Sequence, residues 1–267
     1  MKTLKIALLV VVVLYLLVLL ATYLLQEKII FPAEPLRKDY PFNLTAEDRE
    51  VFIAKPNGDK INGILYKRAG NKGVVLYLHG NAGHLSSWQH MAPEILEHKK
   101  DLLLIDYGGY GKSEGKFSEE GFYTDGKAAY NFLLTEGYKP EDIIIYGRSI
   151  GTGIATQLAT TQKTGGLILE SPYCSIPALG REKMPFLLPG LLLKYQFNNL
   201  EKAPGIKVPV LILHGTDDSL IPAEHGKKLY AAFTTVKTLV LIPGGHHNDL
   251  SEFPEKAAAL QAFLSSH

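Results

Sequence analysis

Residues 147–151 read Gly-Arg-Ser-Ile-Gly, a combination suited to a nucleophilic turn. An apolar run at 143–146 precedes the motif and a segment rich in small residues follows it, so a strand would turn sharply into a helix. Such a turn holds its central residue in a strained conformation and projects the serine oxygen above the sheet. The motif alone arises by chance in roughly one chain in ten of this composition. Its position after a buried strand makes Ser149 the predicted nucleophile.

A serine hydroxyl is a weak nucleophile unless a base takes its proton, and the usual base is a histidine oriented by a carboxylate. Two acids, Asp217 and Asp218, follow one apolar run, and two histidines, His246 and His247, follow the last one. Nucleophile, acid and histidine come in the chain order known for sheets with such a turn. Each pair leaves the carboxyl end of a predicted strand, where open α/β sheets carry their sites. We expect one member of each pair to act with Ser149 and the other to be a solvated or packing residue.

Residues 79–83 read His-Gly-Asn-Ala-Gly and follow another apolar run, at 74–78. The backbone amide of Asn81, with that of Ile150 after the predicted nucleophile, would form an oxyanion hole. Losing one such donor typically lowers the rate by about 10²–10³-fold. A glycine loop is also needed wherever a strand turns tightly into a helix, so this segment could serve the fold alone. Beside the serine, acids and histidines, we interpret it as part of a site that hydrolyses carboxylic ester or thioester bonds through an acyl-enzyme.

Other motif-like segments do not fit their patterns. The Gly-Lys-Ser at 111–113 resembles the end of a phosphate-binding loop, but Asp106 stands where that loop needs its first glycine. Thr156 stands where a dinucleotide-binding fingerprint needs its third glycine. The two histidines with Asp249 lack the helical spacing of a zinc site. We therefore expect no metal, no nucleotide and no other cofactor.

The elements that would position these residues are short apolar runs alternating with segments of helical length. The runs expected to be strands buried on both faces are 74–78, 102–105, 143–146, 167–169, 210–213 and 239–242. The helical segments between them include 118–136, 151–162 and 225–233. This alternation predicts an α/β fold, with a mostly parallel twisted sheet and helices on both faces. Ahead of it, residues 50–54 and 61–66 predict a hairpin around the Pro-Asn-Gly-Asp turn at 56–59.

One segment interrupts the alternation. Residues 184–193 are apolar but cut by proline and glycine, so they form neither one ordinary strand nor a second membrane span. They could be a pair of short packing helices, or a cap above the sheet that builds an apolar pocket. The two interpretations are compatible.

Residues 6–25 carry no charge and are almost wholly apolar, enough to cross a hydrocarbon core as a helix. A cleavable signal peptide is the alternative, but its apolar region is about 7–15 residues long and ends in a small-x-small site. Ala21-Thr22-Tyr23 is a poor version of that site, and the apolar run continues past it. We therefore predict a retained anchor that makes this a single-pass membrane protein.

The expected organisation is an anchor at 1–28, a proline-punctuated connector at 29–47 and one α/β domain at 48–267 that carries the predicted site, with a cap insertion at about 172–206. Lys2 and Lys5 favour a cytoplasmic N-terminus, which would place the catalytic domain on the non-cytoplasmic side. Basic residues after the anchor, such as Lys28, weaken that orientation signal.

Composition limits the range of partners. The 267 residues are 46% hydrophobic, enough for one large core, and 28 basic residues against 27 acidic ones leave a net charge of +1. Such a balance removes the electrostatic reason to expect a nucleic-acid partner. The single cysteine, Cys174, closes no internal disulfide. A small-molecule or acylated substrate and a membrane are the partners we predict.

Together these motifs resemble the α/β hydrolases of the Bem46 type, membrane-anchored relatives of serine esterases and protein depalmitoylases. The resemblance runs from about residue 31 to 263. Its segments are His-Gly-Asn-Ala-Gly at 79–83, Asp-Tyr-Gly-Gly-Tyr-Gly-Lys-Ser at 106–113, Gly-Arg-Ser-Ile-Gly at 147–151, Ser-Pro-Tyr at 171–173, His-Gly-Thr-Asp-Asp at 214–218 and His-Asn-Asp at 247–249. It implies that Asp218 is the acid and His247 the base. One position departs from it, because Gly108 stands where that pattern usually has an arginine.

The resemblance implies a serine esterase or thioesterase, and the anchor and apolar cap suggest acyl-chain or lipid-like substrates. Two alternatives share these features. A peptidase would use the same three residues, and a ligand-binding or scaffolding protein could keep the fold without catalysis.

Overall fold

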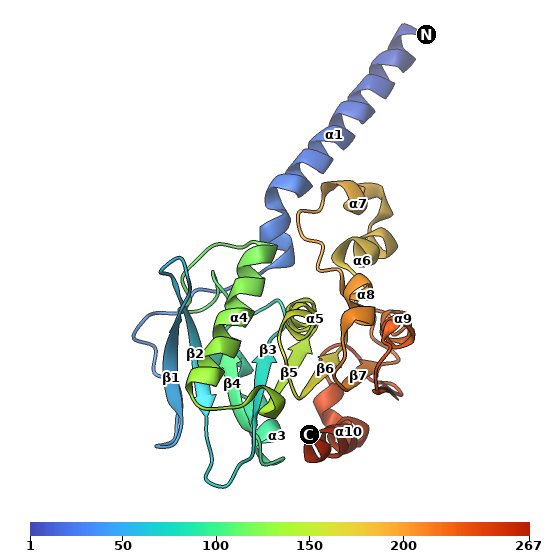
Figure 1. Cartoon of the computed structure of the whole chain (residues 1–267). Coiled ribbons are helices and arrows are strands. Elements are labelled where there is room, and N and C mark those ends of the chain that lie inside the picture. Colours follow the sequence, from blue (N-terminus) through green and yellow to red (C-terminus); the bar gives the residue numbers. More distant parts are fainter.

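The computed structural model describes all residues, 1–267, and contains one eight-stranded sheet in the order β1-β2-β4-β3-β5-β6-β7-β8 (Figure 1). The strands are β1 Arg49–Ala54, β2 Lys60–Tyr66, β3 Val74–Leu78, β4 Asp101–Ile105, β5 Ile143–Arg148, β6 Gly166–Glu170, β7 Val210–Gly215 and β8 Lys237–Ile242. The first two form the predicted antiparallel hairpin, β2 also pairs antiparallel with β4, and every other pairing is parallel. Every predicted strand is present.

The strand order reverses beside β3. The chain runs from β3 to β4 on one side, then crosses to β5 on the other and continues outward to β8. A reversal of this kind leaves an open crevice at the carboxyl ends of the strands, where α/β proteins bind ligands. Ser149 follows β5, so it lies at this crevice.

Helices cover both faces of the sheet. They are α2 Leu85–Trp88, α3 Met91–Leu96, α4 Glu119–Thr135, α5 Gly151–Thr161, α9 Glu224–Ala232 and α10 Pro254–Ser266. Residues of α4, α5 and α9 share one buried cluster with Leu76 and Leu78, whereas α2, α3 and α10 share the other with Val75 and Tyr77. Because successive strand residues point to opposite faces, the apolar runs supply both clusters.

The expectation that all six apolar runs are buried on both faces is wrong for β8. This strand lies at the edge of the sheet, where only Ile242 is buried and Thr238 is exposed. An edge strand has a neighbour on one side only, so solvent reaches it despite its apolar sequence.

The remaining helices are α1 Lys2–Ile30, α6 Ile176–Lys183, α7 Pro189–Leu192 and α8 Asn199–Lys202. Figure 1 shows α1 projecting away from the domain, with α6 and α7 beside its base. Its length and hydropathy are sufficient to cross a membrane. The helix ends at Ile30, so it continues into the first two residues of the segment predicted as a connector.

Candidate active site

Ser149 occupies the sharp turn between β5 and α5 in a left-handed conformation, with φ +52°. The flanking glycines are required by close packing. A Cβ at Gly147 would lie 2.6 Å from the Ala155 Cβ, and one at Gly151 would lie 2.1 Å from the Leu78 carbonyl oxygen. The strain at the serine and the lack of space on each side together explain the local sequence.

Ser149, His247 and Asp218 form a hydrogen-bonded line. The Ser149 Oγ lies 3.0 Å from His247 Nε2, and His247 Nδ1 lies 2.7 Å from Asp218 Oδ2. Since an ionised carboxylate only accepts, Nδ1 carries the proton and Nε2 is free to accept the serine proton. The arrangement can remove a proton from the hydroxyl and stabilise the imidazolium that results.

The loop after β7 fixes the Asp218 carboxylate. Its second oxygen accepts hydrogen bonds from the backbone amides of Leu220 and Ile221, at 3.0 and 2.8 Å. Burial alone would raise the pKa of Asp218, but the hydrogen bonds from His247 and Ile221 outweigh it and lower that pKa. The carboxylate therefore stays charged and fixed in place.

The structure distinguishes the two acids, Asp217 and Asp218, and the two histidines, His246 and His247. Asp217 is exposed and its carboxylate accepts from the Thr216 hydroxyl. His246 is also exposed, and its ring contacts the backbone carbonyl of Asp217. Neither side chain contacts Ser149. His247 contacts it directly, and Asp218 is connected to it through His247.

Arg148 ties the serine turn to the histidine loop. Its guanidinium donates to the backbone carbonyl of His247 and to the side-chain oxygen of Asn248, both at 3.0 Å. It also pairs at 3.0 Å with Glu170, the last residue of β6. The Glu170 backbone carbonyl in turn accepts from the Ser149 amide. Serine and histidine are thus positioned by one connected set of contacts.

Glu170 is the centre of a buried charge network. Lys256 of α10 lies 3.1 Å from the Glu170 carboxylate and 3.0 Å from that of Glu94. The Tyr146 hydroxyl donates to the Glu170 carboxylate. Burial would raise the pKa of Glu170, but Lys256 and Arg148 outweigh it and lower that pKa to about 2. The carboxylate is charged at neutral pH and holds two cations beneath the site.

Two backbone donors lie beside the serine. The amides of Asn81 and Ile150 donate no hydrogen bond within the protein, and both residues line the same cavity as Ser149. The Asn81 loop is held on both sides, since its carbonyl accepts from the Tyr110 hydroxyl and its side-chain amide donates to the Ile30 carbonyl. Free amides at these positions can receive an oxyanion.

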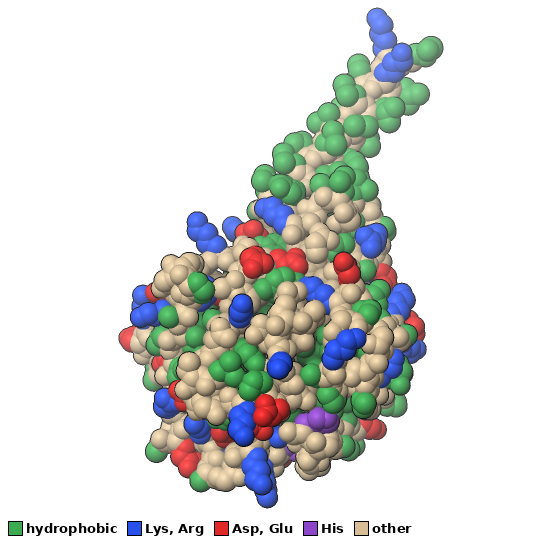
Figure 2. Space-filling model, viewed as in Figure 1, with side chains coloured by type: hydrophobic (Ala, Val, Ile, Leu, Met, Phe, Trp, Pro, Cys, Tyr) green, Lys and Arg blue, Asp and Glu red, His purple; other side chains and the backbone are tan.

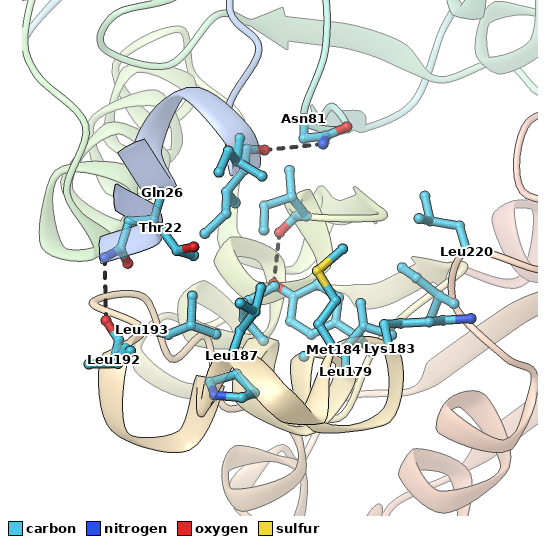
Figure 3. Close-up of a pocket in the computed structure, with 18 of the residues that line it drawn as sticks. Thr22, Gln26, Asn81, Leu179, Lys183, Met184, Leu187, Leu192, Leu193 and Leu220 are labelled. Atoms are coloured by element: carbon cyan, nitrogen blue, oxygen red, sulfur yellow. Dashed lines mark hydrogen bonds between the residues drawn. The ribbon is translucent and has the colours of Figure 1, made fainter. Parts of the chain in front are cut away.

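A cavity of about 420 Å³ extends from Ser149 between the cap and the end of α1 (Figure 3). Of its 20 lining residues 13 are hydrophobic, and none is acidic. The α1 side contributes Thr22, Tyr23, Gln26, Ile29 and Ile30. The cap side includes Leu179, Met184, Leu187, Leu192 and Leu193. Residues 184–193 thus supply part of an apolar cavity wall, and they contain a 3₁₀ turn at Pro185–Leu187 and one short helix, α7, where a pair of short helices is the other interpretation.

A buried cation lies beside Gly108, the position that departs from the pattern. The Gly108 amide donates to Asp125 at 2.7 Å, and Lys55 pairs with the same carboxylate at 3.0 Å. A Cβ at Gly108 would lie 3.3 Å from the Lys55 Nζ and 3.1 Å from the Glu114 carbonyl oxygen. The loop is thus held by a lysine from the end of β1.

Several residues of the site were not predicted from the sequence. The position of Glu170 could have indicated a buried ion pair. It directly follows an apolar run that is predicted to be buried, and a buried acid needs a charged partner. Lys256 in α10 gave no such indication, since its partner Glu94 lies 162 residues away. The sequence also does not predict that α1 contributes to the cavity wall, because a hydrophobic segment indicates a membrane span whatever else it contacts.

The sheet order and the sharp strand-to-helix turn at Ser149 are those of an α/β hydrolase fold. The model of the family described as "Serine aminopeptidase, S33" matches residues 69–199 and 192–253. The chain belongs to this family of α/β hydrolases.

Two relatives and one solved structure are similar over most of the chain. An uncharacterized protein of Mycobacterium tuberculosis is 31% identical over 204 residues, covering 75% of this chain and 73% of that one. The alpha/beta hydrolase domain-containing protein aho-3 of Caenorhabditis elegans is 34% identical over 196 residues, covering 72% and 57%. The Pyrococcus furiosus esterase Pf2001 has a TM-score of 0.69 at 22% identity, covering 88% of this chain and 97% of that one. At that identity the structural likeness concerns the fold.

Proposed function

We propose that the protein is a membrane-anchored serine hydrolase that cleaves carboxylic ester or thioester bonds of acyl-chain or lipid-like substrates. The hydrogen-bonded line from Ser149 through His247 to Asp218 carries the proposal. Ser149 Oγ attacks the carbonyl carbon while His247 takes its proton, and the amides of Asn81 and Ile150 receive the oxyanion. His247 then protonates the departing alcohol or thiol, leaving an acyl-serine. Water, activated by the same histidine, releases the acid and restores the serine.

The cavity supports an acyl group as the bound part of the substrate. Its walls are mostly hydrophobic, and its volume lies within the usual range of about 300–1,000 Å³ for small-molecule sites. An aminopeptidase would have to bind a substrate ammonium group, for which a carboxylate is the natural partner. No acid lines this cavity, and its one charged residue is Lys183. The charge of the wall therefore favours neutral acyl chains over peptides.

Two observations support α1 as a retained anchor. Its apolar stretch is long enough to span a bilayer. Its last turns also form part of the cavity, beginning at Thr22, and the Ile30 carbonyl contacts the Asn81 loop. Cleavage after a signal sequence near residue 23 would remove part of that wall. We propose that the domain lies on the non-cytoplasmic side, from the lysines at positions 2 and 5.

A fluorophosphonate probe tests the nucleophile, because it reacts with an activated serine to give a stable phosphonyl adduct. The full chain in detergent should be labelled, and Ser149→Ala should abolish the labelling. Ser171→Ala is the matched control. Ser171 also has a left-handed backbone, with φ +48°, but its fully buried hydroxyl has no hydrogen-bond partner. Labelling that survives in Ser149→Ala would refute the assignment.

A further inference from the structure

The tip of the cap, residues 184–193, lies alongside α1 over a long distance. The Tyr15 hydroxyl donates to the Phe186 carbonyl at 2.7 Å, and Gln26 bonds to the backbone of Leu192 and Lys194. At the rise of an α-helix, Tyr15 and Gln26 are about 16 Å apart along the axis, roughly half the hydrocarbon thickness of a bilayer. If α1 crosses the membrane, the cap tip lies at the same depth as the part of α1 between Tyr15 and Gln26.

The side chains of the cap tip suit that position. The ten residues carry no charge, and four of their large apolar residues are exposed, including Met184 by 50%, Phe186 by 62% and Leu191 by 79%. Figure 2 shows hydrophobic side chains along the projecting helix, with Lys and Arg side chains at its free tip and around its base. The cap tip extends the apolar surface of α1. A large contiguous apolar patch of that kind indicates a lipid or protein partner.

The backbone of the cap tip is also compatible with an apolar medium. Within hydrocarbon an unpaired N–H or C=O costs several kcal/mol, so backbone groups must be bonded internally. Pro185 and Pro189 have no N–H. Six of the eight N–H groups of the tip donate to backbone carbonyls, that of Met184 to Gly180 in α6 and those of Leu187, Leu188, Leu191, Leu192 and Leu193 within the tip. The Phe186 carbonyl is satisfied by Tyr15 of α1.

Cations stand at both ends of the tip. Lys183 precedes it and Lys194 follows it, and Lys194 also lies 3.9 Å from Glu27 near the end of α1. The Arg181 guanidinium lies beside Gly190, and its long, flexible side chain can extend toward the polar boundary when the tip enters the membrane. Long basic side chains at this level can keep their charges among the polar headgroups of a membrane surface.

We propose that the cap tip inserts into the same leaflet as α1, and that the cavity takes the acyl chain of a bilayer-resident ester directly from that leaflet to Ser149. Met184, Leu187 and Leu192 line the cavity, while Phe186 and Leu191 do not and face outward. The tip thus separates lipid from cavity, and α1 forms the opposite wall. This rests on the anchor and the hydrolase activity proposed above.

Cysteine accessibility in liposomes tests the insertion without using activity. Single substitutions Val11→Cys, Leu191→Cys and Val236→Cys are made in the full chain, whose native Cys174 is buried. All three positions are more than half exposed in the protein, by 62%, 79% and 76%, so protection from a water-soluble maleimide must come from the membrane. Val236 precedes β8, at the end of the sheet away from the site, and serves as the accessible control.

We expect Val11→Cys and Leu191→Cys to react at least 10-fold more slowly than Val236→Cys, because a water-soluble reagent does not enter the hydrocarbon core. If Val11→Cys is protected while Leu191→Cys reacts as fast as Val236→Cys, the anchor stands and the insertion is refuted. If Val11→Cys also reacts fast, the anchor is refuted and the insertion with it.

Activity on two substrates tests the path of the acyl chain. Leu191→Lys should lower kcat/KM for a long-chain ester embedded in liposomes by roughly 10–100-fold, because a charge in the hydrocarbon disfavours insertion. Hydrolysis of a water-soluble butyrate ester should be unchanged, and Val236→Lys should alter neither substrate. Equal losses on both substrates, or no loss on the embedded one, would refute entry from the leaflet. Absence of all hydrolysis in the unaltered chain would refute the proposed function, while the cysteine result would still decide the insertion.

Discussion

The rim of the sheet and the wall of the cavity are built in different ways. At the rim, Asp218 holds His247 while two backbone amides hold Asp218, and Arg148 joins the histidine loop to the buried Glu170. The wall joins α1 and the cap largely by apolar packing, with hydrogen bonds from Tyr15 and Gln26. The three hydrogen-bonded side chains are thus fixed to the sheet, whereas the cavity wall depends on α1 and the cap, which lie outside the sheet.

The largest effect should come from the imidazole at the rim. His247→Ala should lower kcat on a soluble butyrate ester by about 10⁶-fold, since loss of the base in a comparable triad costs that much. His246→Ala is the matched control, because its exposed ring contacts only a backbone carbonyl. The control should stay within about 3-fold, as surface substitutions away from such contacts cost little. Equal losses in both variants would contradict the rim geometry.

Loss of the charge that orients this imidazole should cost less. Asp218→Asn should lower kcat by about 10⁴-fold, because an amide favours the wrong histidine tautomer while leaving the geometry intact. Asp217→Asn changes the exposed neighbour and should have little effect on the same ester. The rates of both variants and of the wild type are compared at the same pH. A strong loss in Asp217→Asn instead would exchange the roles of the two acids.

The rim was largely predictable from the sequence because each part is local. A buried apolar run followed by Gly-Arg-Ser-Ile-Gly predicts the turn at Ser149, and parallel strands bring their carboxyl ends to one edge. Spacing alone left the choice within each doublet open. The choice depends on which side chain points inward, and only the family resemblance anticipated Asp218 and His247.

The wall and the network below the rim were much less predictable. The pairing of Tyr15 with Phe186 spans 171 residues, and hydrophobic periodicity carries no information on such contacts. The sequence also does not reveal which strand lies at the edge of the sheet, so the apolar run of β8 predicts a buried strand. Glu170 could be suspected of having a buried partner, but the identity of Arg148 and Lys256 required the tertiary structure.

Glu170→Gln should test how far the rim depends on the network beneath it. It leaves two buried cations without their shared anion, so the free energy of unfolding should fall by about 3–5 kcal/mol at pH 7. The pKa of Glu170 is lowered from its ordinary 4.5 to about 2 in the folded chain. Its stabilisation is therefore full above pH 4.5 and is lost as the pH falls toward 2.

The stability difference between wild type and Glu170→Gln should accordingly shrink between about pH 4.5 and 2. Urea unfolding of the full chain in detergent, followed by the fluorescence of the single tryptophan, Trp88, measures it. Glu252→Gln, at an exposed acid outside every ion pair, should stay within about 0.5 kcal/mol of wild type. A difference that does not vary over this pH range would contradict a charged Glu170.

Filling the wall should change the choice of substrate and leave the chemistry intact. Leu179→Trp adds bulk to the cavity, so kcat/KM for a palmitoyl ester should fall by roughly 10–100-fold. An acetyl ester should be affected by less than about 3-fold, since it needs little of the cavity. Leu134→Trp, on the outer surface of α4, is the matched control. Equal losses on the two esters would show that Leu179 supports the rim instead.

The smallest effect should come from the one hydroxyl that joins α1 to the cap tip. Side-chain hydrogen bonds inside membranes average about 0.6 kcal/mol, or a factor of roughly 3. In liposomes, Tyr15→Phe should therefore raise maleimide modification of Leu191→Cys by about 3-fold. Tyr23→Phe is the control, because both tyrosines are 39% exposed but the Tyr23 hydroxyl has no hydrogen-bond partner in the protein. No rise in either variant would mean that the tip is held by apolar packing alone, and the wall would then differ from the rim even more than the contacts suggest.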